Sequence, residues 1–171
     1  PDIPHKTEIG GVLLNLTTKE EVEESYQKFI TNVQSYAPKA KIDGIIVAEM
    51  ITGGIETVLG VTKDLVFGPT VMFGLGGVFV EVLKDVTFRV APFGPEEAHR
   101  MIDEIRGRAV LDGARGAPPA DIDALANAIS RLSIFATENS DTIQTIDINP
   151  FLALPKGAVA VDALIIPSSE K

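Results

Sequence analysis

The stretch ETVLGVTKDLVFGPTVMFGLGGVFVEVLKDVTFRV, residues 56–90, contains four apolar runs in succession. We expect strands at 56–62, 70–73, 78–83 and 86–90, because β-branched and aromatic residues fill these runs and turn-forming residues separate them. Consecutive strands favour a largely antiparallel sheet, whereas a doubly wound parallel fold would alternate strand and helix more regularly. The sequence therefore predicts an α+β fold with flanking helices.

Helix signals lie on both sides of this stretch. Thr18 and Glu21 form a capping box, and an apolar stripe at helical spacing follows them as far as Val33. Pro95 begins a second helix, and Asp121 caps a third. The remaining apolar runs predict strands at residues 11–16, 44–51, 143–148 and 159–164.

Length and composition restrict the class of protein. The 171 residues, 45% hydrophobic and 23% charged, suit a single folded domain over residues 1–171. A net charge of −9 without a basic run argues against nucleic acid and anionic membranes as partners. The absence of cysteine excludes disulfides, thiolate metal sites and cysteine nucleophiles. The sequence has neither a membrane-length apolar run nor a secretory signal, so the cytoplasm is the expected compartment. A start at Pro1 without methionine suggests a fragment of a larger chain.

The segment Ile-Asp-Ile-Asn-Pro, residues 146–150, is the most informative one chemically. Side chains alternate along a strand, so Asp147 and Asn149 are predicted to share one face. The chain then returns through a turn at residues 155–157, which could bring Asp162 to the same place. Carboxylate and amide oxygens suit Mg²⁺, which also binds substrate phosphates. The alternative is that Asn149 merely ends a strand and Asp147 is solvated.

Gly-Leu-Gly-Gly, residues 74–77, lies between apolar runs, and its bare amides could approach a phosphate. It lacks the third glycine of a dinucleotide fingerprint and the Gly-Lys-Ser/Thr of a Walker A loop. A tight turn is the competing interpretation.

Single ionisable residues carry less information. His5 could act as a base, a ligand or a phosphoryl acceptor, although a lone histidine near a terminus is usually just exposed. His99 lies on a predicted helix and is interpreted as a surface residue. Glu49, Glu56 and Glu81 are isolated acids in apolar strands, for which an outward position on a half-exposed sheet is the simpler interpretation.

Taken together, these segments resemble a known family. Residues 5–12 (HKTEIGGV), 67–81 (FGPTVMFGLGGVFVE), 85–92 and 113–116 resemble successive motifs of nucleoside-diphosphate-forming acyl-CoA synthetases. The Asp-Ile-Asn-Pro segment and Asp162-Ala163 follow in the same order. The resemblance spans essentially the whole chain and implies the C-terminal lobe of an ATP-grasp domain. Thr7-Glu8 replaces the commoner Ser-Asp, a conservative departure.

The resemblance also implies residue roles, with ATP or ADP and Mg²⁺ as cofactors. His5 matches the histidine that carries a phosphoryl group, and Asp147 matches the acid that stabilises the phosphohistidine. Asn149 and Asp162 match Mg²⁺ ligands. The implied nucleotide-binding residues are Glu49, Met50 and Ile51 at the inter-lobe hinge and Gly76, Gly77 and Glu81 near the phosphates.

The implied reaction converts an acid, ATP and CoA to acyl-CoA, ADP and phosphate through a phosphohistidine carrier. CoA and the acyl substrate would bind other domains or a partner subunit, and an oligomer is expected for the full-length protein. The alternative is a module that senses a nucleotide or CoA ester, fused to a protein acetyltransferase. An isolated lobe that serves as an oligomer interface is a third possibility.

Overall fold

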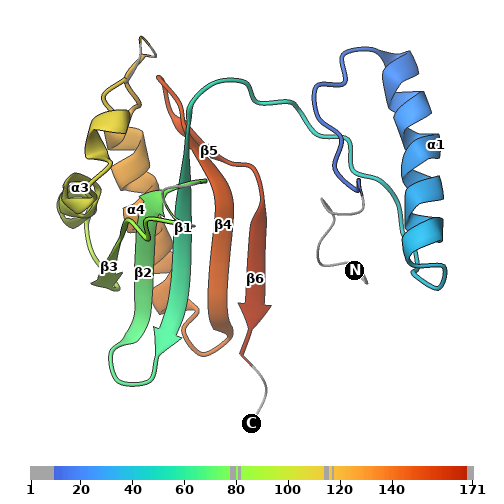
Figure 1. Ribbon diagram of the computed structural model, residues 1–171. Helices are drawn as coiled ribbons and strands as arrows, with labels where there is room; N and C mark the ends of the chain where they lie inside the picture. Colours follow the sequence, from blue (N-terminus) through green and yellow to red (C-terminus); the bar gives the residue numbers. More distant parts are fainter. Residues whose placement is uncertain (1–9, 78–79, 81, 114–115, 117, 169–171) are drawn as a thin grey trace. The chain divides into compact units, whose positions relative to one another are not determined.

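The computed structural model describes residues 10–77, 80, 82–113, 116 and 118–168 (Figure 1). The chain divides into two compact units, the first ending at Thr52 and the second beginning at Gly53. Each unit is described by itself below, and the expectation of a single domain stays a prediction.

The first unit contains helix α1 (Lys19–Tyr36). The predicted capping box is confirmed: Thr18 Oγ1 accepts from the Glu21 amide at 3.2 Å, and Glu21 Oε2 accepts from the Thr18 amide at 3.0 Å. The prediction of strands at 11–16 and 44–51 was wrong, because both segments are irregular. A strand needs a hydrogen-bonded neighbour, and among the described residues neither segment pairs with one.

The second unit is built, within the described residues, on a six-stranded sheet. The strands run in the spatial order β3-β2-β1-β4-β5, with β6 also paired to β4, and all of their pairings are antiparallel. This arrangement confirms the predicted α+β class. The strands are β1 (Ile55–Asp64), β2 (Gly68–Leu75), β3 (Val86–Val90), β4 (Ile143–Ala153), β5 (Ala158–Ala160) and β6 (Ala163–Pro167).

Two predicted strands in this unit need correction. The described part of residues 78–83, which is positions 80, 82 and 83, is a short helical turn and bend instead of a strand. The strand predicted at 159–164 is split into β5 and β6 by an irregular break at Val161 and Asp162. One long strand, β4, pairs with β5 near its end and with β6 along its first half, in the same register on both sides of the break.

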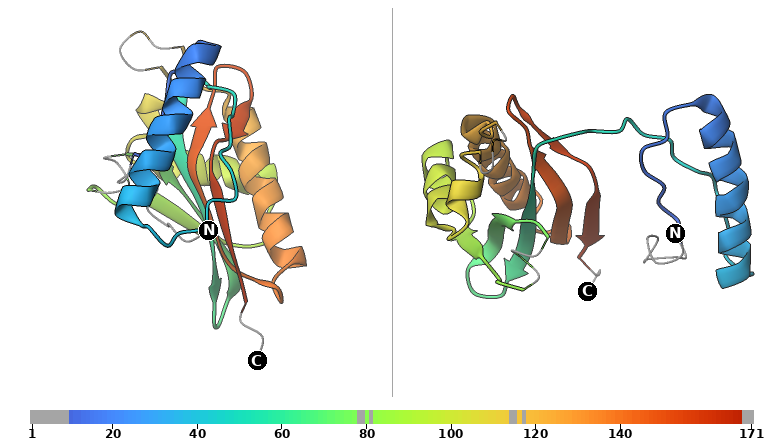
Figure 2. Two further views of the ribbon diagram at one scale, coloured as in Figure 1. Left: turned by 90° about the vertical axis from the view of Figure 1, so that its right-hand side faces the viewer. Right: turned by 45° about the horizontal axis from the view of Figure 1, so that its top comes forward.

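One face of the sheet is covered by α3 (Pro95–Glu104) and α4 (Ile122–Glu138), with the turn η1 (Arg108–Val110) between them (Figure 2). None of the described helices is long and apolar enough to cross a membrane. The core consists of alternate strand residues and the inner stripes of the two helices, as period-two and helical patterns predict. Its fully buried members include Leu59, Val71, Phe73, Leu75, Met101, Ile102, Leu125 and Ile129.

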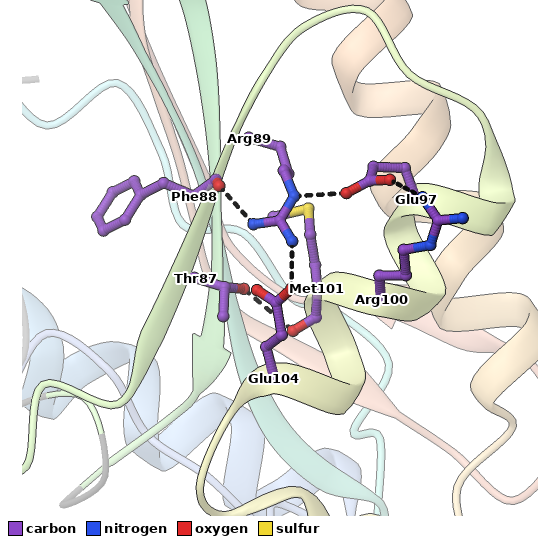
Figure 3. Close-up of polar contacts among 7 residues, drawn as sticks. All are labelled: Thr87, Phe88, Arg89, Glu97, Arg100, Met101 and Glu104. Carbon is purple, nitrogen blue, oxygen red and sulfur yellow. Dashed lines mark hydrogen bonds and ion pairs between the residues drawn. The ribbon is translucent and has the colours of Figure 1, made fainter.

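Ionic and hydrogen bonds attach α3 to the edge strand β3 (Figure 3). Arg89 of β3 donates through Nε to Glu97 and through Nη2 to Glu104, both at 2.6 Å. These two bonds, with Glu97 the larger influence, raise the pKa of the Arg89 guanidinium. Beside them, the buried Thr87 hydroxyl donates to the Met101 carbonyl at 3.1 Å. The helix is thus held at three points against the strand that ends the sheet.

Candidate functional site

Strand β4 carries Asp147 and Asn149 on the face of the sheet opposite α3 and α4. Their core-facing neighbour Ile146 is buried, whereas both polar side chains are exposed. Asp147 pairs with Gly60 of β1 on one side and with Leu164 of β6 on the other. The prediction that Asp147 and Asn149 share one face, made from strand periodicity, is therefore confirmed.

The pairing of β4 with β1 becomes irregular at Asn149. Leu59 pairs with Ile148 and Thr57 pairs with Phe151, so the single residue Val58 lies opposite both Asn149 and Pro150. This is a β-bulge, a feature that commonly re-aims a side chain next to a functional site. Proline has no amide hydrogen to donate to the ladder, which is why it is tolerated at such a position.

Asp162 reaches the same place from the break between β5 and β6. Ala163 pairs with Ile148, so the next residues outward on the two strands are Asp162 and Asn149. The Val161 amide donates to the Pro150 carbonyl at 3.1 Å, which joins the break to the bulge. The predicted convergence of Asp162 with Asn149 is present in the structure, although the chain reaches it through a break and not through a continuous hairpin strand.

The three side chains present free oxygen atoms to solvent. Among the described residues, neither the Asp147 nor the Asn149 side chain has a hydrogen-bond partner. Asp162 uses one carboxylate oxygen, which accepts from the following Ala163 amide at 3.0 Å. No three His, Cys, Asp or Glu side chains in the described part of the chain converge to hold a metal by themselves. This donor set fits Mg²⁺, which binds one or two protein oxygens together with water and substrate phosphates.

The two predicted phosphate-region glycines differ in what they require. The Gly76 amide donates to the Glu56 carbonyl at 2.8 Å, and a Cβ at Gly76 would lie only 3.0–3.2 Å from Glu56 atoms. Close approach of two backbones therefore explains Gly76. Gly77 has a φ of +59° and no atom within 4 Å of the Cβ position, so the positive φ, and not a steric clash, favours glycine there.

The remaining predicted site residues belong to the first unit or fall outside the described residues. Glu49 and Met50 are exposed and Ile51 is half-buried in the irregular end of the first unit. His5 and Glu81 lie outside the described residues. The roles assigned to all five stay predictions.

Known proteins share this sequence and fold. The family model for the ATP-grasp domain matches residues 1–166. The β subunit of ADP-forming acetate–CoA ligase I from Pyrococcus furiosus is 46% identical over 97% of this chain and 71% of its own length. The chain belongs to the ATP-grasp domains of ADP-forming acyl-CoA synthetases. The single-chain ADP-forming acetate–CoA ligase I of Archaeoglobus fulgidus is 41% identical over 99% of this chain, which spans only 24% of that protein.

Solved structures support the same assignment of this ATP-grasp domain. Acetyl-CoA synthetase 1 of Ca. Korarchaeum cryptofilum, in complex with CoA and Ca-AMPCP, superimposes with a TM-score of 0.94 at 46% identity over 98% of this chain and 72% of that one. A second structure of that enzyme contains CoA and Mg-AMPPCP, with its phosphohistidine segment pointing towards the nucleotide site. That match has a TM-score of 0.86 at 43% identity, covering 98% of this chain and 73% of that one.

One structural residue of the ATP-grasp domain had no signal in the sequence. Thr57 is fully buried, and its hydroxyl donates to the Phe151 carbonyl at 2.7 Å, directly beside the bulge. A threonine inside an apolar run is typical of any strand. Thr57 and Phe151 are 94 positions apart in the sequence, so only the pairing of β1 with β4 shows which carbonyl the hydroxyl contacts.

Proposed function

We propose that this domain is the nucleotide-binding part of an enzyme that converts a carboxylic acid, ATP and CoA to acyl-CoA, ADP and phosphate. The observation that carries the proposal is the exposure of Asp147 and Asn149 on one face of β4, with Asp162 next in register to Asn149, in a chain that matches the ATP-grasp family along nearly its whole length. Relatives are named for acetate and for 4-hydroxybutyrate, so the proposal names no particular acid.

Asn149 and Asp162 would hold Mg²⁺ through their side-chain oxygens, and Glu49, Met50, Ile51, Gly76, Gly77 and Glu81 would bind the nucleotide. Bound Mg²⁺ supplies charge neutralisation for the phosphate oxygens, which is most of what phosphoryl transfer needs from its site. The exposure of Asn149 and Asp162 supports this role, because neither side chain is occupied by a contact with another side chain among the described residues.

His5 would accept the phosphoryl group in its neutral form. A ring nitrogen forms a bond to the γ-phosphorus, while the bond from that phosphorus to the β,γ-bridging oxygen breaks and ADP leaves with the electron pair. The phosphorylated imidazole keeps a proton on its other nitrogen, and the Asp147 carboxylate would accept a hydrogen bond from it. In the remaining steps, CoA and the acid would react at other domains or on a partner subunit.

The test uses the full-length protein with Mg²⁺ and γ-labelled ATP. We expect protein-bound label that is labile in acid and stable in base, and we expect His5→Ala to abolish it. His99→Ala is the matched control, since His99 is the only other histidine in the sequence and lies on α3 beside Asp123. Asn149→Ala should reduce labelling at limiting Mg²⁺ more than at saturating Mg²⁺.

Two results would contradict the proposal. If wild-type protein binds nucleotide and takes no label, the domain acts as a nucleotide or CoA-ester sensor. If His5→Ala and wild type are labelled equally, the phosphoryl carrier is another residue.

A further inference from the structure

Strand β4 changes which face it presents to the core at the bulge. Asp147 and Asn149 lie on the exposed face, yet Phe151 and Ala153, which have the same odd spacing, are buried in the core. An uninterrupted strand cannot do this, because residues two apart share a face. The extra residue at Asn149 and Pro150 shifts the alternation by one position. The exposure of Asn149 therefore depends on that bulge staying where it is.

In addition to the pairing of β4 with β1, two hydrogen bonds contact the bulge from opposite sides. On the β5–β6 side, the Pro150 carbonyl accepts from the Val161 amide at 3.1 Å. On the β1 side, the Phe151 carbonyl accepts from the Thr57 hydroxyl at 2.7 Å. Thr57 is itself fully buried, with a relative exposure of 0%. Its hydroxyl thus fastens the first core-facing residue after the bulge.

We propose that Thr57 is a positioning residue for the metal pair Asn149 and Asp162, acting through the bulge that it fastens to β1. The inference rests on the proposed function, because it assumes that this pair binds Mg²⁺. Without the Thr57 hydroxyl, the Phe151 carbonyl loses a buried partner, and on the β1 side the bulge is held only by the ladder pairs that flank it, Thr57 with Phe151 and Leu59 with Ile148. Groups that hydrogen-bond to metal ligands commonly change metal affinity by ~10–100-fold when they are mutated, and Thr57 would act one step further away, through the bulge.

A merely stabilising hydrogen bond would behave differently, and the chain provides a control for it. Thr87 on β3 is also buried, and its hydroxyl also donates to a backbone carbonyl, that of Met101 in α3 at 3.1 Å. This bond lies on the helix-covered side of the sheet, on a strand that is separated from β4 by β2 and β1. Loss of the Thr87 hydroxyl removes a buried hydrogen bond of the same kind and leaves the contacts of the bulge unchanged.

The experiment compares Thr57→Val, Thr57→Ser and Thr87→Val in the full-length protein. Affinity for AMPPCP is measured by calorimetry over a series of Mg²⁺ concentrations, and the melting temperature is measured for each variant. We expect Thr57→Val to raise the half-saturating Mg²⁺ concentration about tenfold. Thr57→Ser should retain the wild-type half-saturating Mg²⁺ concentration because it keeps the hydroxyl. Thr87→Val should lower the melting temperature and leave the Mg²⁺ requirement unchanged.

The inference is overturned if Thr57→Val and Thr87→Val have the same Mg²⁺ requirement, or if Thr57→Ser behaves like Thr57→Val. Should Thr57→Val fail to fold, Thr57→Cys takes its place with the same expected direction, since a thiol is a weaker donor of similar size. Asn149→Ala separates this inference from the proposed function. If Asn149→Ala also leaves the Mg²⁺ requirement unchanged, the assignment of Asn149 and Asp162 as Mg²⁺ ligands is wrong. If Asn149→Ala changes the Mg²⁺ requirement and Thr57→Val does not, the ligand assignment stands and the role of Thr57 is wrong.

Discussion

The Asp121 carboxylate accepts a hydrogen bond from the Gly157 amide at 2.8 Å, which joins the N-terminus of α4 to the turn between β4 and β5. Its other oxygen accepts from the Ala124 amide at 3.0 Å and so caps the helix, as the sequence predicted. The Asp121 amide in turn donates to the Leu154 carbonyl at 2.8 Å. Asp121 therefore connects the N-terminus of α4 to the end of β4, the strand that carries Asp147 and Asn149.

We expect Asp121→Asn to lower the urea midpoint of unfolding at pH 7, because an amide group facing the Gly157 amide replaces an acceptor by a donor. Hydrogen bonds from Gly157, the larger cause, and from Ala124 hold the pKa of the Asp121 carboxyl below its usual value. A lowered folded-state pKa stabilises the fold above the unfolded-state pKa, about 3.9, and this stabilisation is lost as the pH falls through the folded-state pKa.

The difference between wild type and Asp121→Asn should therefore be constant near neutral pH and shrink below about pH 4. Urea titrations at a series of pH values measure it. Asp141→Asn, at an exposed aspartate in the turn before β4, is the control. A difference that grows towards acid would show that the Asp121 contacts do not favour the charged form.

Gly74→Ala should destabilise the second unit through a steric clash. A Cβ at Gly74 would lie 2.8 Å from the Asp85 carbonyl oxygen and 2.8 Å from Val86 Cγ1, and a backbone oxygen cannot move aside alone. Overpacking of this kind costs about 1–3 kcal/mol, which denaturant titration resolves. Gly94→Ala is the control in the same unit, because nothing lies within 4 Å of its Cβ position and its φ is −85°. Equal effects of the two substitutions would contradict the clash.

Arg89→Lys should lower the melting temperature even though it keeps the charge. The guanidinium contacts Glu97 and Glu104 through separate nitrogens, whereas an ammonium group cannot match that fork geometry. Arg100→Lys is the comparison, since Arg100 contacts Glu97 through one nitrogen and is far more exposed. A larger drop in melting temperature for Arg100→Lys would mean that the two-point contact of Arg89 does not hold α3.

Asp147→Asn should separate function from stability. The side chain is exposed and has no hydrogen-bond partner among the described residues, so the free energy of unfolding should change by less than about 0.5 kcal/mol. In the labelling experiment, we expect less phosphohistidine at equilibrium, because the neutral amide stabilises the charged imidazole less than a carboxylate does. Unchanged labelling would remove Asp147 from the proposed mechanism.

Several features of this protein were predictable from its sequence because they depend on neighbouring residues. The capping box of Thr18 and the cap of Asp121 are contacts within one helical turn. The shared face of Asp147 and Asn149 follows from the alternation of side chains along one strand. The apolar stripe that ends at Val33 likewise follows from helical spacing, and Val33 is buried.

Tertiary structure alone decided the features that depend on residues distant in sequence. The apolar runs at 11–16 and 44–51 look like strands, but a strand also needs a partner, and pairing is not encoded in the run itself. The bulge at Asn149 turns Phe151 towards the core while Asn149 stays exposed, and it is seen only in the pairing of β4 with β1. For the same reason the sequence showed Thr57 as an ordinary strand residue, whereas the fold makes it the contact that fastens the bulge.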